Sequence, residues 1–105
     1  MEEVTVSALA EALEHGRPRL IDVRQADEYR SGHVPGAEFI TMSTIPLRLA
    51  DLPRDEKLYV ICESGGRSYQ VCSYLEQHGY DVVTVQGGTG AWRMSGRPLA
   101  HGMEA

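Results

Sequence analysis

Short apolar stretches alternate with segments of helical periodicity along the 105 residues of this chain. The stretches are rich in Val, Ile and Leu, and most are bounded by Gly, Pro or charged residues, which is typical of buried strands. The pattern predicts five strands, at residues 4–6, 19–23, 38–41, 57–61 and 82–85.

Helical spacing of apolar residues fills most of the intervals. Predicted helices cover residues 7–16, with Ser7 as the N-cap, then 26–30, 43–52 and 67–78, and a short last helix carries Trp92. Residues 33–36, with His33, Pro35 and Gly36, are expected to form a turn. Strands alternating with helices predict an α/β domain with a mainly parallel sheet, and the length suits a single domain, residues 1–105.

Composition and charge narrow the classes of function. The net charge is −5 and no basic stripe is present, so we expect no nucleic-acid partner. No apolar run approaches membrane-spanning length and the first residues are acidic, so we expect no membrane association and a cytoplasmic location. Two cysteines and four scattered histidines give no zinc-ligand spacing and no disulfide scaffold, so no structural metal is expected.

Chemistry is expected at the carboxyl ends of the parallel strands, where ligands bind in such sheets. Two predicted loops face the same crevice there: the loop that begins at Asp22 and the loop that begins at Cys62. The second has the sequence VICESGGRS, in which an apolar strand delivers a cysteine to a glycine-containing loop that opens a helix.

This arrangement favours a reactive Cys62. Backbone N–H groups of the loop and the positive end of the helix can stabilise a thiolate at one point. Gly65 and Gly66 permit the tight curvature that such a cradle needs. Cys72, in contrast, lies on the apolar face of the predicted helix with Val71 and Leu75, so we assign it to core packing.

The chain also resembles the rhodanese family. Residues 21–37, IDVRQADEYRSGHVPGA, are similar to the N-terminal rhodanese signature, and residues 87–99, GGTGAWRMSGRPL, to its C-terminal signature. CESGGRS stands between them, where the family has its active-site loop. The resemblance implies a central sheet of five mainly parallel strands flanked by helices on both faces.

By this resemblance the chain is a sulfurtransferase that needs no cofactor. Cys62 would take a sulfur atom from a small donor such as thiosulfate, forming a persulfide, and pass it to cyanide, a thiol or a protein acceptor. The loop that holds the persulfide would comprise Glu63, Ser64, Gly65, Gly66, Arg67 and Ser68.

Three charged residues of these motifs bear on the site, two of them in the N-terminal signature. Asp22 is expected to organise the neighbouring loop, and Arg24 either contacts an anionic substrate or, as we favour, pairs with Asp22. Glu63 stands where thiosulfate-using members of the family carry basic residues in the loop. A carboxylate at the mouth would repel thiosulfate, unless Arg67 turns toward the pocket.

Two other functions are open at this stage. A phosphatase or arsenate reductase also uses a Cys-loop-Arg arrangement, but its pattern has five residues between Cys and Arg, whereas four separate Cys62 from Arg67. A non-catalytic interaction or sulfur-carrier module is the other alternative, although inactive rhodanese-like domains typically lose the cysteine. The run Gly87–Gly90 lacks the Lys-Ser/Thr of a phosphate loop and is assigned to the turn before the last helix.

Overall fold

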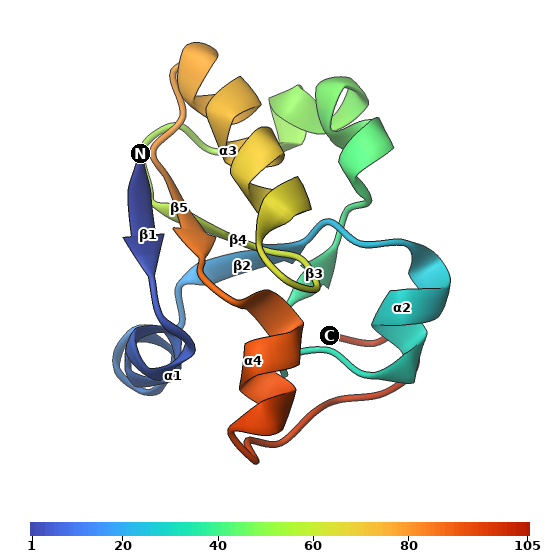
Figure 1. Cartoon of the computed structure of the whole chain (residues 1–105). Helices are drawn as coiled ribbons and strands as arrows, with labels where there is room; N and C mark the ends of the chain where they lie inside the picture. Colours follow the sequence, from blue (N-terminus) through green and yellow to red (C-terminus); the bar gives the residue numbers. More distant parts are fainter.

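A computed structural model describes residues 1–105, and its centre is a sheet of five strands, all parallel (Figure 1). The strands lie in the order β1-β5-β4-β2-β3. Their bounds are β1 Glu2–Val4, β2 Arg19–Asp22, β3 Glu38–Phe39, β4 Leu58–Ile61 and β5 Val82–Val85. The predicted α/β fold with a five-stranded parallel sheet is therefore confirmed.

Helices cover both faces of the sheet, as expected for parallel strands. One face carries α3 (Gly66–Gln77) and the 3₁₀ helix η1 (Met42–Asp51), and the other carries α1 (Val6–His15), α2 (Ala26–Ser31) and α4 (Gly88–Met94) (Figure 1). Because successive side chains of a strand point to opposite faces, each buried strand contributes to two separate cores.

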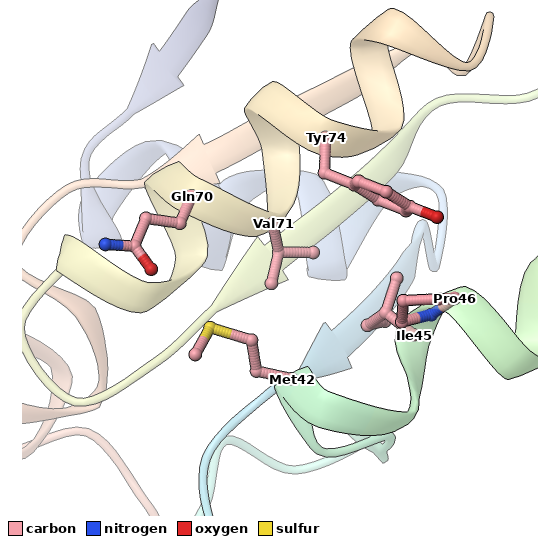
Figure 2. A pocket seen from close by; sticks show the side chains of 6 residues that line it. All are labelled: Met42, Ile45, Pro46, Gln70, Val71 and Tyr74. Atoms are coloured by element: carbon pink, nitrogen blue, oxygen red, sulfur yellow. The ribbon is translucent and has the colours of Figure 1, made fainter.

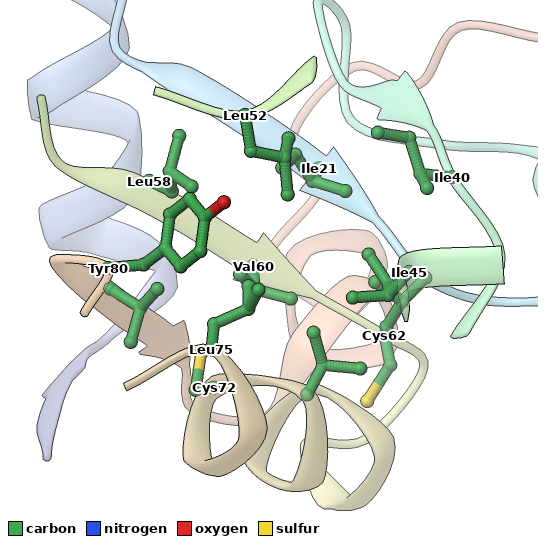
Figure 3. Packing of buried hydrophobic residues seen from close by; sticks show 13 residues of the cluster. Ile21, Ile40, Ile45, Leu52, Leu58, Val60, Cys62, Cys72, Leu75 and Tyr80 are labelled. Carbon is green, nitrogen blue, oxygen red and sulfur yellow. The ribbon is translucent and has the colours of Figure 1, made fainter. Parts of the chain in front are cut away.

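The larger core, which we call the α3 core, lies under α3 and η1 (Figure 3). Its buried residues are Ile21, Val23, Ile40, Ile45, Leu52, Leu58, Val60, Cys62, Val71, Cys72, Leu75, Tyr80 and Val82. The smaller one, the α1 core, lies on the opposite face. Its buried residues are Leu9, Leu20, Tyr29, Val34, Ala37, Ile61, Val85 and Trp92. Cys72 is thus a core residue, as predicted, and Trp92 belongs to the core on the other face.

Two predicted elements near the N-terminus are displaced. The first strand ends at Val4 instead of Val6. The side chain of Thr5 accepts a hydrogen bond from the Ala8 N–H and caps α1, so the helix already begins at Val6. Ser7, predicted as the N-cap, lies inside the helix. The apolar character of residues 4–6 does not distinguish the end of an edge strand from the start of an amphipathic helix.

Two further predictions on the β3 side are wrong in detail. The predicted strand 38–41 is only Glu38–Phe39, since β3 is an edge strand that pairs with β2 over two residues. The predicted helix 43–52 is the 3₁₀ helix η1, with Pro46 inside it. Proline has no backbone N–H to donate, which weakens regular α-helical bonding at that position.

The segment after α2 does more than turn the chain. Pro35 and Gly36 form the expected turn, but His33 is fully buried and stacks on the Tyr29 ring at 3.7 Å. The His33 backbone pairs with Ala100, and its Nε2 lies 2.7 Å from the Glu104 carbonyl oxygen. His33 therefore fastens the C-terminal segment against α2, which a turn assignment from sequence did not include.

None of the helices combines the length and the apolar character that a membrane span requires.

Candidate active site

Three loops meet at the carboxyl edge of the sheet, after β2, β4 and β5. The β4 loop lies between the other two because β4 pairs with both β2 and β5. Arg24 of the β2 loop donates to Glu63 of the β4 loop, with 3.0 Å between Nη1 and Oε1. The β5 loop reaches the same place through the Thr89 N–H, which donates to the Cys62 carbonyl at 2.8 Å.

The Cys62 sulfur lies at the centre of this arrangement. The residue is 1% exposed, and its Sγ accepts hydrogen bonds from the backbone N–H groups of Gly65, at 3.1 Å, and Ser68, at 3.3 Å. The Ser68 hydroxyl lies 3.5 Å from the same sulfur. The loop predicted to cradle a sulfur atom thus directs backbone donors at Cys62.

Local geometry explains why the donors converge. Gly65 has φ +116°, a left-handed conformation that side chains rarely adopt, and it is the N-cap of α3. Ser68 is the third residue of α3, so its N–H has no partner within the helix. The free N–H groups and the positive end of the helix dipole both face the thiol.

The two cysteines differ in acidity. Burial alone raises the pKa of the Cys62 thiol, but hydrogen bonds from the Ser68 side chain and from the backbone of Ser68, Gly65 and Ser64 outweigh it, so this pKa lies below its ordinary value. Burial raises the pKa of Cys72 to about 12. Cys62 is therefore the thiol that ionises readily.

The first residues of α4, directly after the turn that follows β5, hold the backbone of the Cys62 loop. In addition to the Thr89 bond, the Gly90 N–H donates to the Glu63 carbonyl at 2.9 Å. A Cβ atom at Gly88 would lie 2.6 Å from the Glu63 carbonyl oxygen and closer still to that of Cys62. The run Gly87–Gly90 leads into the last helix as predicted, yet it also supports the loop. The sequence feature that could have indicated this support is a run of small residues directly after β5, the strand that pairs with β4.

Asp22 and Arg24 form the buried ion pair that we favoured from the sequence. Arg24 is 1% exposed, and its Nη2 lies 2.9 Å from Asp22 Oδ2. Every nitrogen of the guanidinium donates to a protein acceptor: Nε to Asp22, Nη1 to Glu63, and Nη2 to Asp22 and to the Gly32 carbonyl. This geometry gives Arg24 a role in organising the loops.

Glu63 is not a free charge at the mouth, which corrects the expectation from the sequence. Its two carboxylate oxygens each accept from an arginine, Oε1 from Arg24 and Oε2 from Arg93, both at 3.0 Å. Arg67, which was to offset the Glu63 charge if it turned toward the pocket, is paired with a different carboxylate. Arg67 donates both Nη atoms to Glu28, at 2.7 and 2.9 Å, and this pairing lowers the pKa of Glu28 to about 2.

An apolar groove opens between η1 and α3 (Figure 2). It has a volume of about 200 Å³ and is lined by Met42, Ile45, Pro46, Gln70, Val71 and Tyr74. No residue of the loop Cys62–Ser68 lines it. The groove is therefore separate from the Cys62 sulfur, although Val71 belongs to the same core as Cys62.

A parallel α/β sheet with a cysteine and a helix-opening loop after β4 is the arrangement that the rhodanese resemblance implied. The rhodanese-like domain family model matches residues 5–95, so the chain belongs to this family.

Among its relatives is a protein of Allochromatium vinosum named sulfurtransferase, 41% identical over 81 residues, or 76% of each chain. YtwF of Bacillus subtilis, whose name includes the word sulfurtransferase, is 38% identical over 99 residues, 93% of this chain and 96% of its own. A Staphylococcus saprophyticus crystal structure superposes with a TM-score of 0.88 at 40% identity, covering 96% of this chain and all of the other.

We predict that Gly88→Ala destabilises the protein by about 2 to 4 kcal/mol, because the new methyl group meets two carbonyl oxygens at a positive φ. Chemical denaturation measures this. The control is Gly16→Ala, where a Cβ has only one neighbour, at 3.9 Å, so the free energy of unfolding should change by less than about 1 kcal/mol. Equal effects of the two substitutions would contradict the close contact between Gly88 and the backbone of the Cys62 loop.

We also predict that Cys62 is alkylated with a midpoint below the ordinary thiol pKa of about 8.5, because its thiolate form is favoured. The rate should rise with pH through this lowered midpoint, whereas Cys72 should stay slow. Iodoacetamide labelling resolves the two, since trypsin cleavage after Lys57, Arg67 and Arg93 puts the cysteines in different peptides. A Cys62 midpoint at or above that of an unperturbed thiol would refute the prediction.

Proposed function

We propose that the protein transfers a sulfane sulfur from a donor to a thiophilic acceptor through a persulfide on Cys62. The observation that carries this proposal is the Cys62 Sγ at a strand end, held by the N–H groups of Gly65 and Ser68 at the start of α3. Membership of a family with sulfurtransferase-named relatives supports the same reaction.

The first half-reaction makes one S–S bond and breaks another. The Cys62 thiolate attacks the outer sulfur of a donor such as thiosulfate, and the bond to the donor's second sulfur breaks. Sulfite leaves with the electron pair, so the product is Cys62–S–S⁻ and the total charge is unchanged. Backbone N–H groups of the loop then face the new negative sulfur and stabilise it.

The second half-reaction restores the enzyme. A thiolate or cyanide attacks the outer persulfide sulfur, which leaves with the acceptor as a new persulfide or as thiocyanate. Cys62 regains its electron pair as a thiolate, which its hydrogen bonds stabilise as before. No cofactor and no net oxidant are required, because one sulfane sulfur is exchanged in each half.

Charges around the mouth favour a donor of low charge over a small dianion. The three arginines of this region are each paired with a carboxylate: Arg24 with Asp22 and Glu63, Arg67 with Glu28, and Arg93 with Glu63. Three cations and three carboxylates leave no unpaired positive charge for thiosulfate. A persulfide carried by a thiol or by a protein is therefore the donor that we favour over thiosulfate.

Phosphoryl transfer fits the site less well. A bound phosphoryl group needs donors for three oxygens, and in the Cys-loop-Arg arrangement the arginine is expected to contribute. Here Arg67 follows a shorter loop and both of its Nη atoms are held by Glu28. The loop residues also include no obvious general acid for a leaving group.

We predict that Cys62→Ser abolishes sulfur transfer, because a hydroxyl does not form the persulfide, and that Cys72→Ser leaves most of the turnover intact. Thiosulfate:cyanide assays measure both, and circular dichroism confirms that each variant is folded. After donor treatment, the intact mass should show a cyanide-labile gain of one sulfur in the wild type and in Cys72→Ser. The same gain should be missing in Cys62→Ser. Cys62-dependent hydrolysis of p-nitrophenyl phosphate without persulfide formation would support the phosphatase alternative instead.

For Glu63→Gln we expect the KM for thiosulfate to fall about three- to tenfold at low ionic strength. The substitution removes the negative charge of the residue that follows Cys62 and frees the half-exposed Arg93 to bind the dianion. Added salt should shrink the difference through screening. The exposed Glu11→Gln on α1 makes the same change in net charge far from the mouth and should leave KM unaltered. An unchanged KM for Glu63→Gln would show that this carboxylate does not control donor choice.

A further inference from the structure

A buried chain of hydroxyl groups runs from the Cys62 sulfur into the α3 core. The Ser68 hydroxyl lies 3.5 Å from Cys62 Sγ and 2.8 Å from Thr84 Oγ1. Ser68 is 0% exposed and Thr84, in the middle of β5, is 2% exposed. Neither the sequence pattern nor the family resemblance assigned a role to Thr84.

The Ser68 hydroxyl has one proton and three neighbours that compete for it. Its Oγ also lies 3.1 Å from the Gly65 carbonyl oxygen, which only accepts hydrogen bonds. The Cys62 sulfur donates as a thiol and accepts as a thiolate, and the Thr84 hydroxyl can do either. Only when Thr84 donates to Ser68 is the single Ser68 proton free for the thiolate.

The partners of the two hydroxyl groups favour this direction. Ser68 Oγ is the only hydrogen-bond partner found for Thr84 Oγ1. The Ser68 hydroxyl has other acceptors for its own proton, at the Gly65 carbonyl oxygen and at Cys62 Sγ, so both buried protons are used when Thr84 donates to Ser68. Hydrogen bonds that run in one direction along a chain strengthen one another in a low-dielectric interior.

We propose that Thr84 is a positioning residue for Cys62: its hydroxyl donates to Ser68 Oγ and thereby directs the Ser68 proton to the Cys62 thiolate. When the sulfur carries a proton, the Ser68 hydroxyl turns to the Gly65 carbonyl instead. Thr84 touches neither the sulfur nor a substrate, and acts through Ser68. This inference rests on the proposed function, because the Cys62 thiolate that Thr84 would help to stabilise is the group that attacks the sulfur donor.

The same relay serves both forms of the reacting cysteine. A persulfide carries its negative charge on the outer sulfur, one atom farther from Ser68, so the hydroxyl is no longer needed at Sγ and is again free for Gly65. When the acceptor removes the outer sulfur, charge returns to Sγ and the Ser68 proton returns with it. Thr84 would then stabilise the thiolate as attacking group in the first half-reaction and as leaving group in the second.

The test follows the Cys62 thiol by its alkylation rate as a function of pH, which needs no sulfur transfer. Thr84→Val keeps the shape and removes the hydroxyl, so the Cys62 midpoint should rise by about 0.5 to 1 pH unit, the range expected for one lost hydrogen bond. Thr84→Ser keeps the hydroxyl and should restore a midpoint close to that of the wild type. The tryptic peptide that contains Cys62 reports each value.

A double-substitution cycle shows whether Thr84 acts through Ser68. Ser68→Ala should raise the midpoint further, and adding Thr84→Val to Ser68→Ala should then raise it by much less than Thr84→Val does alone. An unchanged midpoint in Thr84→Val, or additive shifts in the double variant, would overturn the proposal. Should Thr84→Val yield too little folded protein, Thr84→Ala compared with Thr84→Ser makes the same distinction.

Failure of this inference and failure of the proposed function give different results. If the midpoint of Cys62 alkylation shifts as predicted but no sulfur transfer is found, Thr84 still positions the Ser68 proton and the proposed function is wrong. Sulfur transfer with a midpoint insensitive to Thr84 would keep the function and remove the relay.

Discussion

The structure around Cys62 depends on one constraint: a sulfur atom that carries negative charge must be compensated where water does not reach it. Burial by itself disfavours the thiolate, and the protein offsets this cost with fixed dipoles. The N–H groups of Gly65 and Ser68 direct their positive ends at Sγ, and the Ser68 hydroxyl lies 3.5 Å from the same atom. The left-handed Gly65 and the start of α3 directly after the loop are the local consequences of this requirement.

Ion pairs around the loop meet a related constraint. Arg24 is buried, and a buried guanidinium without partners would cost several kcal/mol. Asp22, Glu63 and the Gly32 carbonyl surround it, so the loops after β2 and β4 and the end of α2 are joined through one side chain. The ion pair with Arg24 also neutralises the Glu63 carboxylate, which would otherwise repel an anionic donor. The Arg24 side chain therefore both joins the loops and neutralises the Glu63 charge at the mouth of the site.

The sequence predicted the sheet, the helices and the place of Cys62 between a strand and a helix, because these depend on local patterns: apolar runs, helical spacing and a cysteine followed by glycines. It did not predict the partners of Glu63 and Arg67, since an ion pair between residues 39 apart, such as Arg67 and Glu28, leaves no local signal. The contact between Thr84 and Ser68 was not predicted for the same reason. A single threonine in the apolar run VVTV is typical of a buried strand and does not indicate a partner. His33 was assigned to a turn because the chain that it fastens returns about 70 residues later.

Cys62 is held from both faces of the sheet at once. Its side chain lies in the α3 core and is fixed by the start of α3, while its carbonyl is fixed by Thr89 at the start of α4, on the side of the α1 core. Two layers that a parallel sheet otherwise keeps apart therefore meet at a single residue. A disturbance in either layer, even one far from the loop, would reach the sulfur as a change in its position or in its donors. The position of the Cys62 sulfur and its hydrogen bonds thus depend on both layers of the fold at once.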